Sequence, residues 1–477
     1  MKIRFYYKQI SAILDKIYGG ELLMEVRDKL LSEKPWKLMI SLSIPAILGQ
    51  FIVGLYAFVD SIYVGQMVGT DAMSAVSAAS PFVMINNAIA VLVGIGSGSV
   101  LSRAIGKKDQ KTVDKIMGNL IFLVILLSTA VMVLGIIFAP SFLKLSGAQG
   151  VVHEMGVSYL RTVYIGSIFV NFMQAANMVI RAEGRMGIAM GIMASGAFLN
   201  IILDPVFIKL LPSQGPQAVA IATVISQFVQ ALATLIYFLK KSPVVKIYGI
   251  RIAKELNGEI FSVGTSAMLM QIMMLVQMTV VYNTAVRYGG DTQIALMGAS
   301  QRVMQLAFVP IWGMSQGMQP AVGTNFGAKE YKRVKKLTNV FIIGSTCLAG
   351  VFFINIELFS SQILSAFITN PDIVSAGVTN FRLMFSIFPT YGLLIMVVTY
   401  FQSLGKAKQA GLLVLFRQLA LVVPLVLILP ILLGGNVIGV WLALPLNDII
   451  ILLIALILLA REYKYLNKIS VNYENVK

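Results

Sequence analysis

Residues 187–207 read GIAMGIMASGAFLNIILDPVF, an apolar segment with one carboxylate near its end. No charged residue occurs from Met186 to Leu203, which predicts a membrane-spanning helix with Asp204 at membrane depth. A carboxylate in hydrocarbon costs about 2.5–3.5 kcal/mol, so such an acid normally faces a cavity, finds a partner or binds a cation. Asn200 stands four residues earlier, on the same helix face as Asp204. The segment therefore predicts a polar site within a membrane helix.

The composition is that of an integral membrane protein. Hydrophobic residues make up 57% of the 477 residues, charged residues make up 12%, and the mean hydropathy is +0.83. Most uncharged windows can cross a hydrocarbon core of about 30 Å. We split the long window 418–447 at Gly434-Gly435 and join its second part to window 449–460 across Asp448. This gives twelve predicted helices, hence an all-α membrane fold. The windows are 38–59, 72–102, 116–143, 162–180, 186–203, 210–239, 260–286, 303–328, 337–356, 383–405, 418–447 and 449–460.

The formal net charge of +17 is unevenly distributed among the loops. Lysine and arginine clusters follow every second predicted span, whereas the alternate loops carry few basic residues. This positive-inside pattern predicts that both termini are cytoplasmic. The basic charge thus reports topology, and we expect no nucleic-acid partner. The clusters lie at 107–115, 181–185, 240–254, 329–336, 406–408 and 461–468.

The second half of the chain repeats the first at a shift of 221 residues, which indicates a duplication. Each copy holds six predicted spans, an even number, so both copies share one orientation and are expected to form two pseudo-symmetric lobes about a cleft. The predicted parts are an N-terminal extension at 1–34, an N-lobe at 35–241, a cytoplasmic linker at 242–258, a C-lobe at 259–462 and a cytoplasmic tail at 463–477. Corresponding glycines are Gly96 with Gly317, Gly106 with Gly327, and Gly184 with Gly405.

The acidic positions were not duplicated, because Asp60 corresponds to Val281 and Asp204 corresponds to Leu425. Both acids lie on predicted spans that run from the inside to the outside. At about 1.5 Å per residue, both carboxylates reach the outer half of the membrane, where they can face each other. The asymmetry between the copies therefore places the predicted site in the first lobe.

Asn200 and Thr223 complete this predicted cluster. Thr223 comes early in the returning span, so its hydroxyl reaches a similar depth. Two carboxylates, an amide and a hydroxyl suit a small hard cation such as Na⁺, or proton exchange. Three structural alternatives stay open: Asp60 as an interfacial residue, Asp204 with Pro205 as a kink device, and Thr223 bonded to its own helix backbone.

Other charged residues also lie at membrane depth, in the second half. Arg417 and Asp448 reach comparable levels on neighbouring spans and are interpreted as a structural ion pair, with a transport role as the alternative. Three more have no assigned role and either line the cleft or extend to an interface: Arg302, Glu357 and Arg382.

Several kinds of chemistry find no support in the sequence. Cys347 is the only cysteine and His153 the only histidine, so no cysteine cluster, zinc site or histidine-based dyad is expected. We therefore predict a protein that is not an enzyme, with no cofactor and no metal beyond Na⁺ at the acidic cluster. Residues 1–34 lack a signal-peptide core and are interpreted as a basic amphipathic helix on the inner leaflet, with a disordered tail as the alternative.

Methionine is frequent, with 25 residues and a concentration between Met268 and Met318. Its flexible side chain can repack around dissimilar ligands, although ordinary membrane packing explains the same pattern. The side chains predicted to line a substrate cavity are Met173, Met190, Gln271, Met274, Asn283 and Gln319.

Several of these segments together resemble the multidrug and toxic compound extrusion transporters, in particular their bacterial branch. The matching pieces are Pro45, Asp60, VGTDA at 68–72, RAEG at 181–184, Asn200 to Pro205, QGMQP at 316–320 and GTNFGA at 323–328. The likeness covers nearly all of residues 35–460.

The resemblance implies two six-helix lobes in a V and a cleft with alternating access. It also implies export of cationic, often aromatic compounds, driven by inward Na⁺ or H⁺, across a bacterial cell membrane. Asp60, Asn200, Asp204 and Thr223 would then form the ion site of the first lobe. The partners expected are small-molecule substrates and the lipid bilayer, with the protein acting as a monomer.

An alternative from the same broad fold group is a flippase for a lipid-linked oligosaccharide. It requires cationic side chains in the cleft, so Arg302, Arg382 and Arg417 pointing together into a cavity would favour it. Arginines buried in ion pairs would count against it. A channel is less favoured, because the inferred lobe pair has one cleft and no continuous pore.

Overall fold

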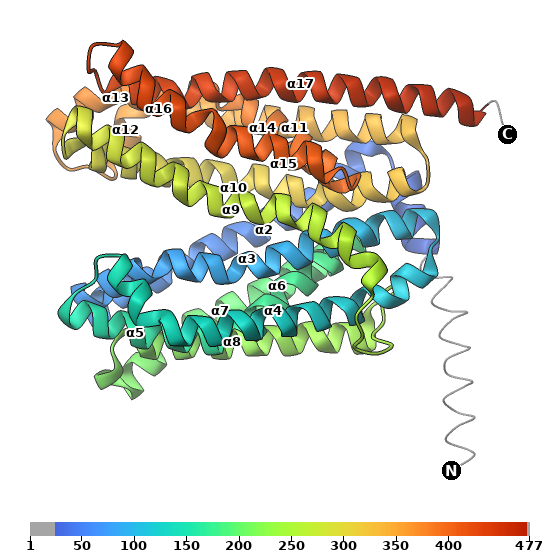
Figure 1. The fold of residues 1–477 in the computed structure, drawn as a ribbon, viewed down its shortest axis with the longest axis horizontal. Coiled ribbons are helices and arrows are strands. Elements are labelled where there is room, and N and C mark those ends of the chain that lie inside the picture. The colour runs from blue at the N-terminus through green and yellow to red at the C-terminus, as the bar shows by residue number, and fades with distance from the viewer. Residues whose placement is uncertain (1–23, 475–477) are drawn as a thin grey trace. The chain divides into compact units, whose positions relative to one another are not determined.

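The computed structural model describes residues 24–474, and every regular element in this range is helical (Figure 1). Eleven of its helices or continuous helical stretches are long and apolar enough to cross a membrane. A further pair, α5 (Gly150–Ile165) and α6 (Ser167–Ala182), passes the same test together but is bent by 53°. Counting this pair as one span gives twelve, which confirms the predicted fold class.

The remaining helices follow in chain order, with a few short turns between them. The first half holds α2 (Pro35–Tyr63), α3 (Thr70–Lys107), α4 (Gln110–Leu145), α7 (Met186–Leu210) and α8 (Pro216–Ile236). The second half holds α9 (Lys254–Gly289), α10 (Thr292–Gly327), α11 (Tyr331–Leu358), α12 (Ser360–Ser365), α13 (Pro371–Phe385), α14 (Pro389–Ser403), α15 (Ala407–Leu415), α16 (Val422–Leu432) and α17 (Ile438–Glu474). π-Helical turns occupy η1 (Val64–Val68), η3 (Tyr237–Lys241) and η4 (Phe416–Ala420), and η2 (Pro212–Gln214) is a 3₁₀ turn.

The chain divides into two compact units. Of the described residues, unit 1 holds 24–38, 48–264 and 319–330, and unit 2 holds 39–47, 265–318 and 331–474. In unit 1, α3 packs along α4 and α6, and α7 packs along α8. In unit 2, α11 packs along α14, and α16 packs along α17. The roles predicted for residues 1–34, 242–258 and 463–477 stay predictions, and most of the N-terminal extension lies outside the described residues.

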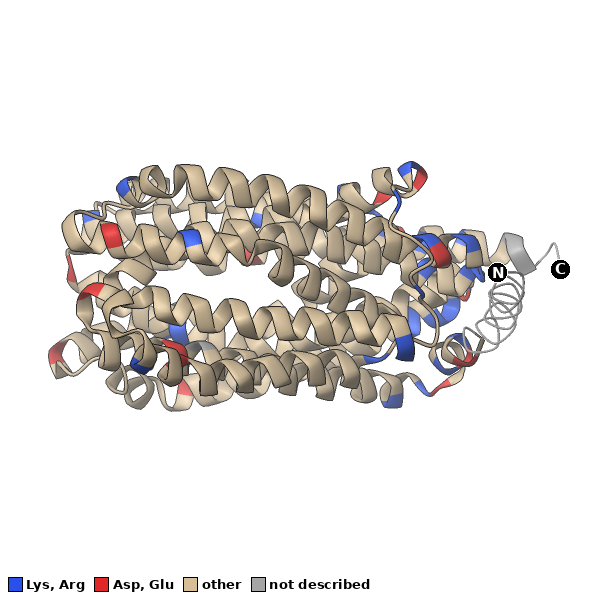
Figure 2. Ribbon diagram, turned by 90° about the horizontal axis from the view of Figure 1, so that it is seen from below, with Lys and Arg blue, Asp and Glu red and all other residues tan. Residues whose placement is uncertain are grey.

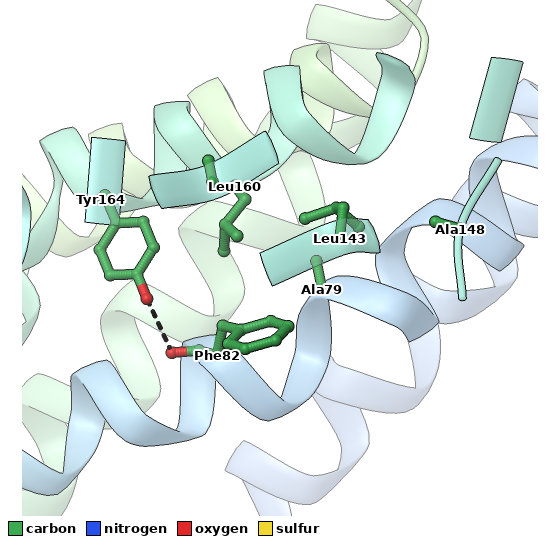
Figure 3. Packing of buried hydrophobic residues seen from close by; sticks show 7 residues of the cluster. Ala79, Phe82, Leu143, Ala148, Leu160 and Tyr164 are labelled. Carbon is green, nitrogen blue, oxygen red and sulfur yellow. Dashed lines mark hydrogen bonds between the residues drawn. The ribbon is translucent and has the colours of Figure 1, made fainter. Parts of the chain in front are cut away.

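Aromatic and aliphatic side chains of α5 pack against α3 and α4 (Figure 3). Leu160 and Tyr164 of α5 are buried against Phe82 of α3 and Leu143 of α4. The Tyr164 hydroxyl donates a 3.2 Å hydrogen bond to the Phe82 carbonyl. Because one face of α5 is held in this way, the orientation of its remaining residues is fixed within unit 1.

The segment that follows α8 is tied to unit 1 by buried polar groups. The Glu183 carboxylate, in the turn between α6 and α7, accepts hydrogen bonds from the Tyr237 hydroxyl at 2.7 Å, the Ser242 hydroxyl at 2.5 Å and the Val245 amide at 2.8 Å. Burial raises the pKa of Glu183 to about 7, against the opposing effect of these bonds.

The same segment is held a second time further along the chain. Asn119 of α4 accepts a 2.7 Å hydrogen bond from the Ala253 amide and donates a 2.8 Å bond to Asn257. The stretch between α8 and α9 is therefore anchored on unit 1 at both of its ends.

Lysine and arginine residues gather at one end of the helices, and fewer lie at the opposite end (Figure 2). Ion pairs order part of this basic end, including Arg103 with Glu259 and Lys115 with Glu255, all within unit 1. The distribution follows the loop pattern of the sequence, on which the predicted orientation of the termini depends.

Candidate ion-coupling site

The centre of the candidate site is the Asn200–Asp204 pair on α7. The Asn200 amide donates to Asp204 Oδ1 at 3.1 Å, as the spacing of four residues predicts for neighbours on one helix face. The same amide nitrogen lies 3.3 Å from the Thr223 hydroxyl of α8. Asp204 is 0% exposed and Asn200 is 2% exposed. The structure thus brings together three of the four residues predicted for the site.

Asp60 of α2 supplies the fourth group. Its carboxyl group and that of Asp204 are close enough to form a side-chain hydrogen bond when one of them carries a proton. Three buried oxygens in this cluster accept no hydrogen bond from any described donor, namely Asp60 Oδ1, Asp204 Oδ2 and Asn200 Oδ1. Such atoms are costly unless a proton or cation satisfies them. This set of oxygens fits a small hard cation as well as a proton.

Two tyrosines near the acids were missed by the sequence reasoning. Tyr56 and Tyr159 are both half-buried and lie close enough to interact electrostatically with Asp60 and Asp204. Tyr56 stands four residues before Asp60 on α2, so helix periodicity could have found it. Tyr159 lies on α5, and no local pattern links it to the acids, because its position depends on how α5 packs.

Local backbone features shape the helices around the acids. Pro205 follows Asp204 and has no N–H, so the Ile201 carbonyl one turn earlier loses its usual helical donor. The π-helical turn Val64–Val68 begins one turn after Asp60 and widens the end of α2. Turns of this kind are frequent at functional sites.

Close packing of α7 on α8 brings Asn200 to Thr223. A Cβ atom at Gly196 would lie 1.9 Å from the Gln230 side-chain nitrogen, so only glycine admits Gln230 at this position. Gln230 crosses this gap and donates a 3.0 Å hydrogen bond to the Met193 carbonyl of α7. The glycine and the glutamine together set the separation of the two helices.

A cavity of about 90 Å³ adjoins the acidic cluster within unit 1. Met173, Asn200 and Thr223 all line it, so the cavity and the polar cluster share side chains. Two other side chains predicted for the substrate cavity lie elsewhere in this unit. Met190 is buried against Gly49, and Gln319 donates a 3.2 Å hydrogen bond to the Ile95 carbonyl. The remaining three belong to unit 2, where their role stays a prediction: Gln271, Met274 and Asn283.

Unit 2 contains the predicted pair of Arg417 and Asp448. Arg417 Nε lies 3.0 Å from Asp448 Oδ1, and the guanidinium stacks 4.7 Å from the Tyr391 ring centroid. Asn447 donates to the Arg417 carbonyl at 3.1 Å, inside the π-helical turn η4. These contacts suit a structural pair, although its role is still a prediction.

The other charged residues left unassigned also lie in unit 2. Arg382 pairs with Glu357 at 3.6 Å and donates to the Ser360 hydroxyl at 2.9 Å. Arg302 is exposed. Arg382 and Arg417 are thus each engaged with a separate acid.

Comparison with known proteins identifies the family. A family model described as MatE matches residues 45–206 and 266–428, which is more than half of the chain. The chain belongs to the MatE family. The second match begins at residue 266, which is residue 45 moved by the repeat shift of 221. As a MatE protein, it is a multi-pass membrane transporter rather than an enzyme.

Relatives and solved structures of MatE proteins cover most of the chain. The multidrug export protein MepA of Staphylococcus aureus strain MSSA476 is 27% identical over 402 residues, which are 84% of this chain and 88% of MepA. MepA of Staphylococcus saprophyticus is 26% identical over 389 residues, covering 81% and 86%.

Among solved structures, a MOP superfamily transporter from Pyrococcus furiosus matches with a TM-score of 0.87 and 25% identity over 92% of this chain and 98% of that one. A MATE protein in a bent conformation, 24% identical, matches with a TM-score of 0.87 over 95% and 99%. The latter likeness concerns the fold alone.

Proposed function

We propose that this MatE protein exports cationic, often aromatic compounds from a bacterial cytoplasm in exchange for inward Na⁺ or H⁺. One observation carries the proposal: Asp60 and Asp204 face each other inside a helical unit, and one oxygen of each, together with Asn200 Oδ1, is buried without a described donor. The relatives named multidrug export proteins support the direction and the class of cargo.

The coupling follows from electrostatics. Two carboxylates at close range in a medium of low dielectric repel each other, and one positive charge between them relieves this repulsion. A proton on either carboxyl group could be shared by both. A sodium ion could instead take its ligands from the Asp60, Asp204 and Asn200 oxygens and the Thr223 hydroxyl. The same residues thus accommodate either ion.

The link between ion and cargo lies in two shared side chains. Asn200 and Thr223 contact each other in the acidic cluster and also line the adjoining cavity. A change in their orientation when an ion binds therefore alters the cavity wall, which provides coupling between the two sites. Two states with different ion affinity are sufficient for exchange.

At about 90 Å³ the cavity admits only part of a cargo molecule, and its lining favours an aromatic or cationic group there. Tyr56, Met173 and Met193 offer aromatic and polarizable surface. Among the described residues that line the cavity there is no lysine or arginine. The acidic cluster alongside adds negative potential.

The test is efflux of ethidium from proteoliposomes with the sodium and proton gradients imposed separately. The wild-type protein should respond to one of the two gradients. Asp204→Asn and Asp60→Asn should each lower the gradient-driven component by about tenfold or more, because the coupling ion loses a carboxylate ligand. Asp291→Asn, which removes an exposed charge in unit 2, is the matched control and should transport normally. Undiminished gradient-driven efflux by Asp204→Asn would refute the coupling role.

The flippase alternative is less well supported. It depends on free arginines that converge on a cavity, whereas Arg417 is engaged with Asp448 and Arg382 with Glu357. Scrambling of a labelled lipid-linked oligosaccharide by the reconstituted protein, without an ion gradient, would favour it nonetheless.

A further inference from the structure

A groove of about 380 Å³ lies on unit 1 at the end of the bundle where α4 ends and α5 begins. Its walls come from the end of α4, the length of α5 from His153 to Ile165 and the start of α8. Charged and polar side chains line it: His153, Glu154, Ser158, Arg161 and Gln217. It is separate from the acidic cluster and shares no lining residue with the cavity beside Asn200.

A break in α4 anchors Arg161 in this groove. Pro140 has no N–H, so the Ile136 carbonyl four residues earlier lacks its helical donor. Arg161 Nε donates to this carbonyl at 3.3 Å. The bond uses one of the five guanidinium donors, while the side chain as a whole remains exposed. One edge of the Arg161 guanidinium is thus hydrogen-bonded to α4, and its other N–H groups can donate to an anion.

Two further contacts order the groove. His153 Nε2 lies 3.0 Å from the Pro140 carbonyl, which fixes the imidazole ring beside the helix break. The Ser158 hydroxyl donates to Gln217 Oε1 at 2.7 Å and so bridges α5 and α8. The polar wall is therefore built from groups that hold one another in place.

The exposed side chains that α5 contributes to the groove change character in a definite order. Ile165, in the last turn, is an apolar residue at 57% exposure. Arg161 comes about 6 Å nearer the start of α5 than Ile165, and exposed Glu154 about 10 Å beyond Arg161. From the membrane centre outward the order is apolar, cationic and anionic. A phosphoethanolamine lipid presents its acyl chains, phosphate and ammonium in this same order.

We propose that this groove binds the headgroup of a zwitterionic aminophospholipid. Arg161 binds the phosphate through charge-assisted hydrogen bonds, Glu154 binds the ammonium, and Ile165 contacts the upper acyl chain. The topology predicted from the loops places this lipid in the outer leaflet. Glu154 disfavours a purely anionic headgroup such as phosphatidylglycerol, because its carboxylate would have no counter-charge there.

The test is lipid retention by the full-length protein, measured by native mass spectrometry after purification from vesicles of equimolar phosphatidylethanolamine and phosphatidylglycerol. The wild-type protein should retain phosphatidylethanolamine preferentially. Arg161→Gln should lower this retention by about tenfold, because a hydrogen-bonded charge pair is lost. Glu154→Gln should remove the preference between the two lipids while some retention remains. Both positions are exposed, so the variants should elute as the wild-type protein does.

The matched control is Arg287→Gln, which removes another exposed arginine, placed in unit 2. It should retain lipid like the wild-type protein. Equal retention by the Arg161 and Arg287 variants would overturn the proposal, and so would a wild-type preference for phosphatidylglycerol. Displacement of the bound lipid by millimolar free phosphoethanolamine would show a soluble headgroup site and overturn the lipid assignment.

Discussion

Replacing Gly196 by alanine tests how the close packing of α7 on α8 supports the candidate site. The new Cβ would lie 1.9 Å from Gln230 Nε2, 2.0 Å from Cδ and 2.1 Å from Cγ, whereas ordinary contact begins near 3.4 Å. Gln230 would therefore have to withdraw by roughly 1.3–1.5 Å, towards the adjoining cavity that it also lines. Its 3.0 Å hydrogen bond to the Met193 carbonyl would be lost.

The expected cost combines two effects. Overpacking costs about 1 kcal/mol, the low end of its usual range, because the flexible Gln230 side chain can shift towards the cavity, and a buried donor without a partner adds about 1–3 kcal/mol. We expect Gly196→Ala to lower the free energy of unfolding by about 2–4 kcal/mol, and to reduce gradient-driven efflux because Asn200 moves away from Thr223. Denaturant unfolding in detergent micelles measures the first effect, and ethidium efflux from proteoliposomes measures the second.

Two further variants make this prediction decisive. Gly191→Ala is the matched control on the same helix, because nothing lies within 4 Å of its Cβ position. It should leave stability unchanged or raise it by about 0.5–1 kcal/mol through better helix propensity. The double variant Gly196→Ala with Gln230→Ala should recover part of the loss, since the clash is gone. If Gly196→Ala unfolds like Gly191→Ala, the packing argument is wrong.

Three other perturbations give sharp expectations. Leu160→Ala should cost about 2 kcal/mol through lost packing in the cluster of Figure 3, whereas exposed Leu145→Ala should be neutral in the same unfolding assay. Arg417→Met should lower the free energy of unfolding by about 3–5 kcal/mol, because it leaves Asp448 buried without a counter-charge. Adding Asp448→Leu should restore most of the stability, and no recovery in this double variant would contradict the account. Glu183 lies in a turn outside the membrane-spanning helices, and its folded pKa of about 7 exceeds the unfolded value of 4.5, so the folded state binds more protons in this range. The free energy of unfolding should therefore fall by about 3 kcal/mol as the pH rises from about 4.5 to 7. Glu183→Gln should make stability less dependent on pH in this range. If the pH dependence is unchanged in the variant, Glu183 is not its cause.

The parts of the site that could be predicted from the sequence depend on helix geometry alone. The contact of Asn200 with Asp204 follows from their spacing of four residues, and the approach of Asp60 follows from equal depth on spans of equal direction. The pairing of Arg417 with Asp448 was also predictable from depth.

Contacts that depend on helix rotation and tertiary packing could not be predicted in this way. Tyr159 reaches the acids because the cluster around Leu160 sets the orientation of α5, and no periodicity in the sequence encodes that orientation. Met190 was expected in the substrate cavity but packs beneath Gly49, about one turn of α7 before Met193, which does line the cavity.

The double anchoring of the stretch between α8 and α9 has a consequence for how the protein can move. Glu183 holds this stretch near Val245, and Asn119 holds it again at Ala253 and Asn257. Because this stretch is bound to unit 1 at both of its ends, inserting residues into it would not give the two halves of the chain more freedom to move. Asn257 is the last residue anchored in this way, so any hinge along this part of the chain lies beyond it, within α9 itself.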